Sequence, residues 1–202
     1  MERYRIVGDV GVYFVTFTVV EWLPVFIDEP PCKVLTNSLN FCIHNKHLRV
    51  HAYVVMPTHL HAVVFDSEFK SERLKHTLDD MRKFTGRQLA DYCSRHMPRY
   101  YTEIFRKHAG DDRQRRFWQP TQHAEGIMTQ KFWQEKVNYI HWNPVCKGLV
   151  RCPEDWRFSS AAFWLADKVE NDVELVGLDW SEETCGRRDS AGSETRAEPS
   201  VV

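Results

Sequence analysis

The pattern of apolar and polar positions predicts alternating strands and helices along most of the chain. Runs of β-branched and aromatic residues predict buried strands at 13–20, 48–56 and 59–65. Only Pro57-Thr58 separates the second run from the third, so these two strands are expected to form a hairpin. A short fourth strand is expected at 117–125.

Helical spacing of apolar residues predicts helices between and after these strands, at 30–47, 71–96 and 129–143. The last helix is expected to end at Asn143, because Pro144 disfavours helical geometry in the residue before it. The segment 97–116 is polar, basic and irregular, and we expect a loop there.

The order β-α-β-β-α-β-α predicts an α+β fold of the ferredoxin-like sandwich type, with a four-stranded antiparallel sheet and helices packed on one face. A chain of 202 residues, 43% of them hydrophobic, can build one core of ordinary size. We expect one domain at 1–165, followed by an acidic and partly disordered tail at 166–202. No apolar run reaches the ~18 residues that a membrane helix needs, and we expect neither a signal peptide nor a membrane partner.

The net charge of −1 hides an asymmetry along the chain. Residues 167–202 carry ten acidic and four basic side chains, which leaves a net charge of +5 on the rest. The segment 73–116 contains twelve Lys and Arg residues against six acidic ones. A basic body with an acidic tail favours a polyanionic partner, although a solvated helix face explains the same charges equally well. The six cysteines form no C-x-x-C pair, which excludes a zinc ribbon. Since we expect no secretory segment, reduced cytoplasmic thiols are the default.

The tripeptide His59-Leu60-His61 on the third predicted strand is the first candidate for chemistry. Side chains two residues apart on a strand point to the same side. The two imidazoles therefore converge, and they could form half of a divalent-metal site. A pair of hydrogen-bonded surface histidines explains the same tripeptide and is the commoner case.

The end of the last predicted helix carries the second candidate. Tyr139 and Asn143 are four residues apart and lie on one helical face. Asn143 has a carbonyl oxygen that could complete a metal site, and Tyr139 places a phenol one turn away. A packed tyrosine and a capping asparagine are the plainer interpretation of this pair.

These motifs together resemble those of the one-tyrosine HUH-endonuclease transposases, and among them the REP-associated tyrosine transposases of bacteria. His59-Leu60-His61 matches the histidine-hydrophobic-histidine signature. The residues before that signature and around Tyr139 are similar to the family's lead-in strand and tyrosine helix, at 50–57 and 139–150. Trp118-Gln119 and 155–160 fit the same pattern, and the resemblance runs from about residue 13 to residue 164.

The resemblance implies an enzyme that cleaves and rejoins single-stranded DNA containing hairpins. Tyr139 would attack the scissile phosphate and leave a free 3′-OH and a 5′-phosphotyrosine link. His59, His61 and Asn143 would bind Mg²⁺ or Mn²⁺, which polarises the phosphate. Two-tyrosine relatives commonly carry their second tyrosine one turn after the first, and the asparagine at this position favours the one-tyrosine mechanism.

Basic residues of the second helix and the following loop are expected to contact DNA phosphates: Arg82, Lys83, Arg87, Arg113, Arg115 and Arg116. Tyr100, Tyr101 and Trp118 are candidates to stack on unpaired bases, with ordinary core or surface roles as the equal alternative. His123 could be an accessory metal ligand, but a plain polar strand residue is the commoner case.

The resemblance favours a monomer over a domain-swapped dimer. It also implies a cytoplasmic bacterial protein that is associated with the nucleoid when bound to DNA. Two alternatives stay open: a replication or mobilisation initiator that nicks DNA with the same chemistry, and a domesticated nucleic-acid-binding module without cleavage. The complete set of His59, His61, Tyr139 and Asn143 argues against the second alternative, because binding alone needs none of these groups.

Overall fold

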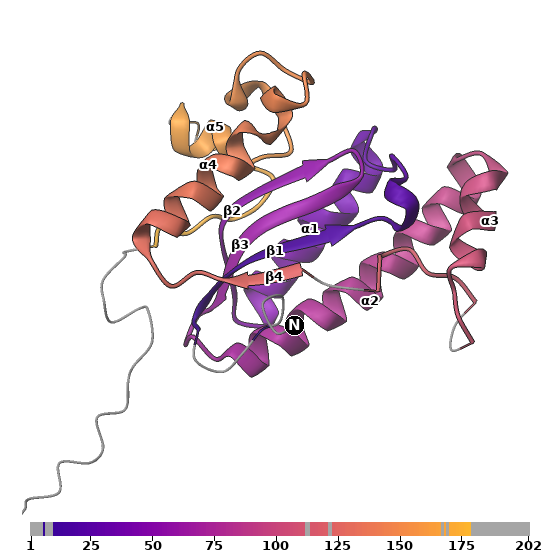
Figure 1. Ribbon diagram of the computed structural model, residues 1–202, viewed down its shortest axis with the longest axis horizontal. Helices are drawn as coiled ribbons and strands as arrows, with labels where there is room; N and C mark the ends of the chain where they lie inside the picture. Colours follow the sequence, from indigo (N-terminus) through magenta and orange to yellow (C-terminus); the bar gives the residue numbers. More distant parts are fainter. Residues whose placement is uncertain are drawn as a thin grey trace, which may run out of the picture.

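Four strands form one antiparallel sheet in the computed structural model, which describes residues 6, 10–111, 114–120, 123–166, 168 and 170–178 (Figure 1). The strands are β1 (Val12–Thr18), β2 (Leu48–Met56), β3 (His59–Asp66) and β4 (His123–Gly126). Their order across the sheet is β2-β3-β1-β4. Helix α1 (Glu29–Asn45) joins β1 to β2, and α2 (Ser71–His96) follows β3. This is the predicted ferredoxin-like α+β fold.

The two faces of the sheet belong to two separate apolar cores, because successive strand side chains point to opposite sides. Tyr13 and Phe17 of β1 pack into the larger core, which α1 and α2 cover. Val12 and Phe14 pack into the smaller core with Ile140 of helix α4 (Gln130–Cys146). Helix α4 is the helix predicted at 129–143, but it covers the second face of the sheet, so the prediction that all helices pack on one face was wrong in this respect. Helix α4 lies over β2 and β3 (Figure 1).

Three local predictions were wrong. The segment expected to be a loop contains helix α3 (Arg99–Lys107), whose Tyr101 and Phe105 are buried four residues apart on one face. Strand β4 begins later than expected. Helix α4 continues through Pro144 to Cys146, since a proline in the last turn removes only one helical hydrogen bond, that of its own missing N–H.

Residues 170–178 lie against the body of the protein. Val173 is 1% exposed and belongs to the larger core. The Val176 N–H donates to the Val50 carbonyl at 3.0 Å, so this segment runs beside the edge strand β2. Asp172 pairs with Lys33 of α1. The tail beyond residue 178 lies outside the described residues, and its disorder stays a prediction.

Three short helices complete the described chain: η1 (Val20–Trp22), η2 (Pro153–Asp155) and α5 (Ala161–Leu165). Helix η1 follows β1 directly, and α5 lies beyond α4 on the second face of the sheet (Figure 1). None of the helices in the described part of the chain is both long enough and apolar enough to cross a membrane.

Candidate active site on the open face of the sheet

The two histidines of β3 lie side by side, with ring centroids 4.4 Å apart. Each ring is held through Nδ1: His59 lies 2.8 Å from Oγ1 of Thr58, and His61 lies 2.8 Å from Oγ1 of Thr16. With Nδ1 protonated, this N–H donates to the threonine hydroxyl, and the lone pair on Nε2 is available to a proton donor or a metal. The predicted convergence of the imidazoles is therefore present.

Burial keeps both imidazoles uncharged near neutral pH. Desolvation lowers the pKa of His59 to about 4, and the positive charge of Lys147 adds to this effect. Desolvation also lowers the pKa of His61 well below its usual value, with smaller contributions from His59 and Lys136. A neutral imidazole is the form that binds a metal.

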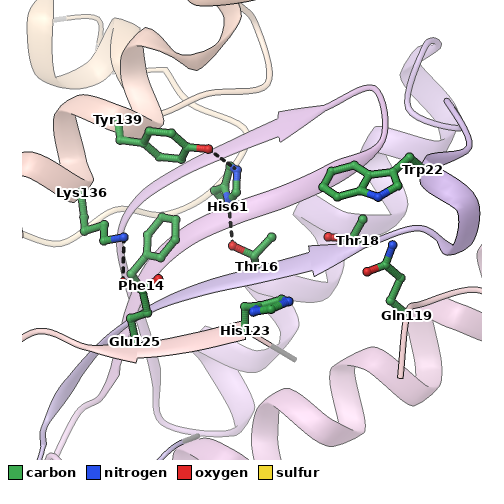
Figure 2. Close-up of a pocket in the computed structure, with 10 residues that line it drawn as sticks. All are labelled: Phe14, Thr16, Thr18, Trp22, His61, Gln119, His123, Glu125, Lys136 and Tyr139. Atoms are coloured by element: carbon green, nitrogen blue, oxygen red, sulfur yellow. Dashed lines mark hydrogen bonds and ion pairs between the residues drawn. The ribbon is translucent and has the colours of Figure 1, made fainter. Parts of the chain in front are cut away.

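Helix α4 brings Tyr139 over these histidines. Its phenolic oxygen lies 3.4 Å from Nε2 of His61, and its ring stands edge-on to the rings of His61 and Phe14 (Figure 2). The side chain is 51% exposed, so it is not a packed core residue. Tyr139 of the second motif therefore meets His61 of the first.

Asn143 lies one turn after Tyr139 and is only 4% exposed. Its Oδ1 is buried and has no hydrogen-bond partner among the described residues. Asn143 is inside α4, whose C-cap residue is Lys147, so capping does not explain the side chain. A buried acceptor without a partner is costly unless something binds it, which fits a metal ligand.

The residues around His59 and His61 limit which side chains could complete a metal site. In the described part of the chain, no group of three His, Cys, Asp or Glu residues is placed to hold a metal. A metal centre here would therefore combine the imidazoles of His59 and His61 with an amide oxygen, and Asn143 offers one. The carbonyl oxygen would suit a hard cation such as Mg²⁺ or Mn²⁺, whereas the two imidazoles favour softer divalent metals.

A pocket of about 410 Å³ opens beside Tyr139, within the ~300–1,000 Å³ usual for ligand sites. Its floor is a row of residues paired across the sheet: Thr16 of β1 lies between His61 of β3 and His123 of β4. The lining residues are Phe14, Thr16, Thr18, Trp22, His61, Gln119, His123, Glu125, Lys136 and Tyr139 (Figure 2).

Lys136 contributes a positive charge to this pocket. Its Nζ lies 2.8 Å from a carboxylate oxygen of Glu125 and 4.4 Å from the centroid of the Phe14 ring. Lys136 precedes Tyr139 by three residues, so both project from one side of α4. The sequence reasoning missed Lys136 and Glu125, although the helical spacing of Lys136 from Tyr139 was a usable signal.

Trp22 forms the opposite wall, and the sequence reasoning missed it as well. Glu21 and Trp22 adopt left-handed backbone angles, with φ of 53° and 54°. Such angles cost on the order of 1 kcal/mol or more for residues other than glycine. The indole is 57% exposed, and its ring centroid lies 5.7 Å from that of His59.

The basic residues predicted to contact DNA differ in their surroundings. Lys83 and Arg87 are exposed on α2. Arg82 is half-buried and donates to the carbonyl of Gln119 at 2.6 Å. Arg115 is paired with Asp91 at 2.6 Å. Arg116 is half-buried, and Arg113 lies outside the described residues.

Two of the aromatic candidates belong to the core. Trp118 is 5% exposed and Tyr101 is 8% exposed, so of the two alternatives the core role holds for both. Tyr100 is 52% exposed. His123 is exposed at the start of β4 and reaches the pocket, and its role as ligand or plain strand residue stays a prediction.

Comparison with solved structures finds the same architecture elsewhere. This chain is similar to a REP-associated tyrosine transposase whose structure was solved bound to a REP hairpin, with 20% sequence identity and a TM-score of 0.56. The match covers 93% of this chain and 98% of that chain. The two proteins share a fold. The resemblance seen in the sequence motifs is thereby confirmed at the level of the fold.

A bacterial tRNA(His) guanylyltransferase (Thg1)-like protein in complex with ATP is also similar, at 8% identity over 85% of this chain and 75% of that one. Its TM-score is 0.31, which is too low to support an argument. No protein-family model matches this sequence, and no curated protein matches it significantly.

Proposed function

We propose that this protein is a DNA-binding transposase that cleaves and rejoins single-stranded, hairpin-containing DNA through a 5′-phosphotyrosine intermediate. One observation carries the proposal: the Tyr139 hydroxyl lies 3.4 Å from Nε2 of His61, beside an open pocket. The fold shared with a REP-associated tyrosine transposase supports this class of reaction.

Tyr139 is the nucleophile of the proposed reaction. Its phenolic oxygen forms a bond to phosphorus while the bond from phosphorus to the 3′ oxygen breaks. The downstream part of the strand stays on the tyrosine through its 5′ phosphate. The phenol gives up its proton, and the leaving oxygen takes one up, so the upstream part ends in a free 3′-OH. The half-exposed ring leaves room for a strand to approach. Attack by a different 3′-OH on the phosphotyrosine reverses the step and joins a new strand.

His59, His61 and Asn143 are the residues that would hold Mg²⁺ or Mn²⁺, and the partnerless Oδ1 of Asn143 supports this assignment. A divalent cation bound there polarises the scissile phosphate and offsets the charge growing on its oxygens. Lys136 also lines the pocket, where its charge is balanced by the Glu125 carboxylate 2.8 Å away.

His61 and Tyr139 share one nitrogen lone pair. With Nδ1 of His61 protonated, the phenolic O–H donates to Nε2, which is also the atom that would serve as a ligand. One lone pair cannot accept the phenolic hydrogen bond and bind a metal at the same time. The hydroxyl must therefore leave Nε2 when this nitrogen acts as a ligand. It is then free to turn toward a phosphate in the pocket.

The proposed enzyme acts as a monomer. Tyr139 and His61 of the same chain meet in one site, so no second copy is needed to supply the tyrosine helix. We place its action on nucleoid DNA in the bacterial cytoplasm, where reduced thiols are the rule. The described cysteines are free, which agrees with such a compartment.

The test is a covalent-adduct assay with Mn²⁺ and labelled single-stranded hairpin DNA taken from the sequence that flanks the gene. We expect an adduct on a denaturing gel with the wild type and none with Tyr139→Phe or after addition of EDTA. Tyr100→Phe is the matched control, because Tyr100 is 52% exposed and Tyr139 is 51% exposed. This control should form the adduct normally.

Other outcomes favour the alternatives. Tight, metal-independent binding by all three proteins without an adduct would indicate a nucleic-acid-binding module that does not cleave. An adduct on single strands without a hairpin, with no strand joining, would favour an initiator nickase.

A further inference from the structure

Trp22 is an exposed aromatic side chain held in place by a rigid segment. On either side of it, Val20 is 1% exposed and Leu23 is 3% exposed. The Val20 N–H donates to the Phe117 carbonyl at 2.9 Å, and the Glu21 carboxylate lies 2.7 Å from Nε2 of His108. The left-handed backbone at Glu21 and Trp22 is therefore imposed by its surroundings.

The position of the Trp22 indole indicates a role in binding the DNA strand. Figure 2 shows Trp22 and Tyr139 on either side of His61, above the same strip of sheet. A strand whose phosphate lies at Tyr139 and His61 would extend its neighbouring base over Thr16 and Thr18 toward Trp22. Unpaired bases bind to proteins chiefly by stacking on aromatic rings of this kind.

Gln119 lines the same pocket as Trp22 (Figure 2). Its main chain is fixed on both sides, because its N–H donates to the Thr18 carbonyl at 2.8 Å and its carbonyl accepts from Arg82 at 2.6 Å. The side-chain amide offers a donor and an acceptor together, which is the combination that recognises the edge of a base.

We propose that Trp22 is the stacking platform for the base of the nucleotide next to the scissile phosphate, and that Gln119 recognises the edge of that base. The inference rests on the proposed function for the place of the phosphate. It adds a specificity-determining subsite: Trp22 gives affinity for any base, and Gln119 gives preference among bases.

The experiment measures stacking directly, with full-length protein carrying Tyr139→Phe so that the strand stays intact. The probe is the flanking-sequence hairpin oligonucleotide, with 2-aminopurine placed in turn at each unpaired position. We expect binding to quench the fluorescence at one position. Trp22→Leu should abolish this quenching and weaken binding about 5-fold or more, because the ring is lost while apolar bulk remains.

Phe41→Leu is the matched control, since Phe41 is also 57% exposed but lies on α1, which covers the other face of the sheet. It should change neither signal. Gln119→Ala should keep the quenching but reduce the preference for one base at that position. If Trp22→Leu unfolds more easily, Trp22→Phe keeps a ring and should restore both stacking and affinity.

Quenching and affinity that are unchanged in Trp22→Leu would overturn the platform. The adduct assay with Tyr139 intact separates this failure from failure of the proposed function. Trp22-dependent quenching without any adduct would leave the platform standing and refute the cleavage chemistry. An adduct together with quenching that does not depend on Trp22 would support the cleavage chemistry and refute the stacking platform. If no variant bound the oligonucleotide, both the platform and the proposed function would be refuted.

Discussion

The phenolic oxygen of Tyr139 lies 3.4 Å from Nε2 of His61, although the two residues are 78 positions apart in the chain. Nδ1 of the same imidazole lies 2.8 Å from Oγ1 of Thr16, so His61 is held between a strand neighbour and the tyrosine. The ring is therefore oriented before any substrate arrives. Its Nε2 is the atom for which the tyrosine and a metal would compete.

This competition predicts a gain in metal affinity when the hydroxyl is removed. Tyr139→Phe should bind Mn²⁺ more tightly than the wild type, with an affinity up to about 5-fold higher. The reason is that no O–H then occupies Nε2 of His61. Isothermal titration with MnCl₂ measures the change, and Tyr100→Phe serves as its control. Markedly weaker binding by Tyr139→Phe would mean that the phenol itself is a ligand.

Metal binding should raise the thermal unfolding temperature, because a ligand that binds only the folded state stabilises it. We expect this rise in the wild type on replacing EDTA with MnCl₂, and we expect it to be lost in His59→Ala, His61→Ala and Asn143→Leu. His123→Ala should retain the rise if His123 is a plain strand residue. Loss of the rise in His123→Ala would make this residue a fourth ligand.

Mild acid should destabilise the protein. Desolvation lowers the pKa of the buried His141 to about 4, and the nearby His51 adds to this effect. The pKa of an unfolded histidine is about 6.5, so below that pH the unfolded chain binds more protons and the free energy of unfolding falls as the pH drops toward 4. One such histidine costs about 1 kcal/mol between pH 7.5 and 5.5.

Urea unfolding at these two pH values tests the effect. His141→Gln should show a smaller loss of stability between them than the wild type. His44→Gln is the control, since the His44 side chain is 62% exposed and should leave the loss unchanged. Equal losses in the wild type and His141→Gln would show that His141 does not contribute.

The exposed cations of α2 should contribute to DNA affinity without contributing to sequence preference. Lys83→Met and Arg87→Met should each weaken binding of all strands alike and lower the slope of log affinity against log salt by about 0.7, as expected for one phosphate contact on a single strand. Fluorescence anisotropy over a salt series measures this slope. Arg95→Met, further along the same helix, should leave it unchanged, and an unchanged slope in Lys83→Met and Arg87→Met would place the strand elsewhere.

The elements of the site could be predicted from the sequence because their signals are local. Alternation along β3 places His59 and His61 on one face, and the four-residue spacing along α4 does the same for Tyr139 and Asn143. The order of strands and helices was sufficient to predict a four-stranded antiparallel α+β sheet, but not that α4 covers the face opposite α1 and α2. Helix α3 was not predicted, because only two of its residues, Tyr101 and Phe105, are buried. Two apolar positions among charged neighbours are too few to show a helical repeat.

Only the tertiary structure decided how these pieces combine. The sequence by itself determined which side chains share a face within one strand or helix, since that depends on the repeat of the backbone alone. Which strand lies beside which, and so the row of His61, Thr16 and His123, depends on packing between distant segments. The same packing places Lys136 beside Glu125 and holds Trp22 in a left-handed conformation that no local preference favours.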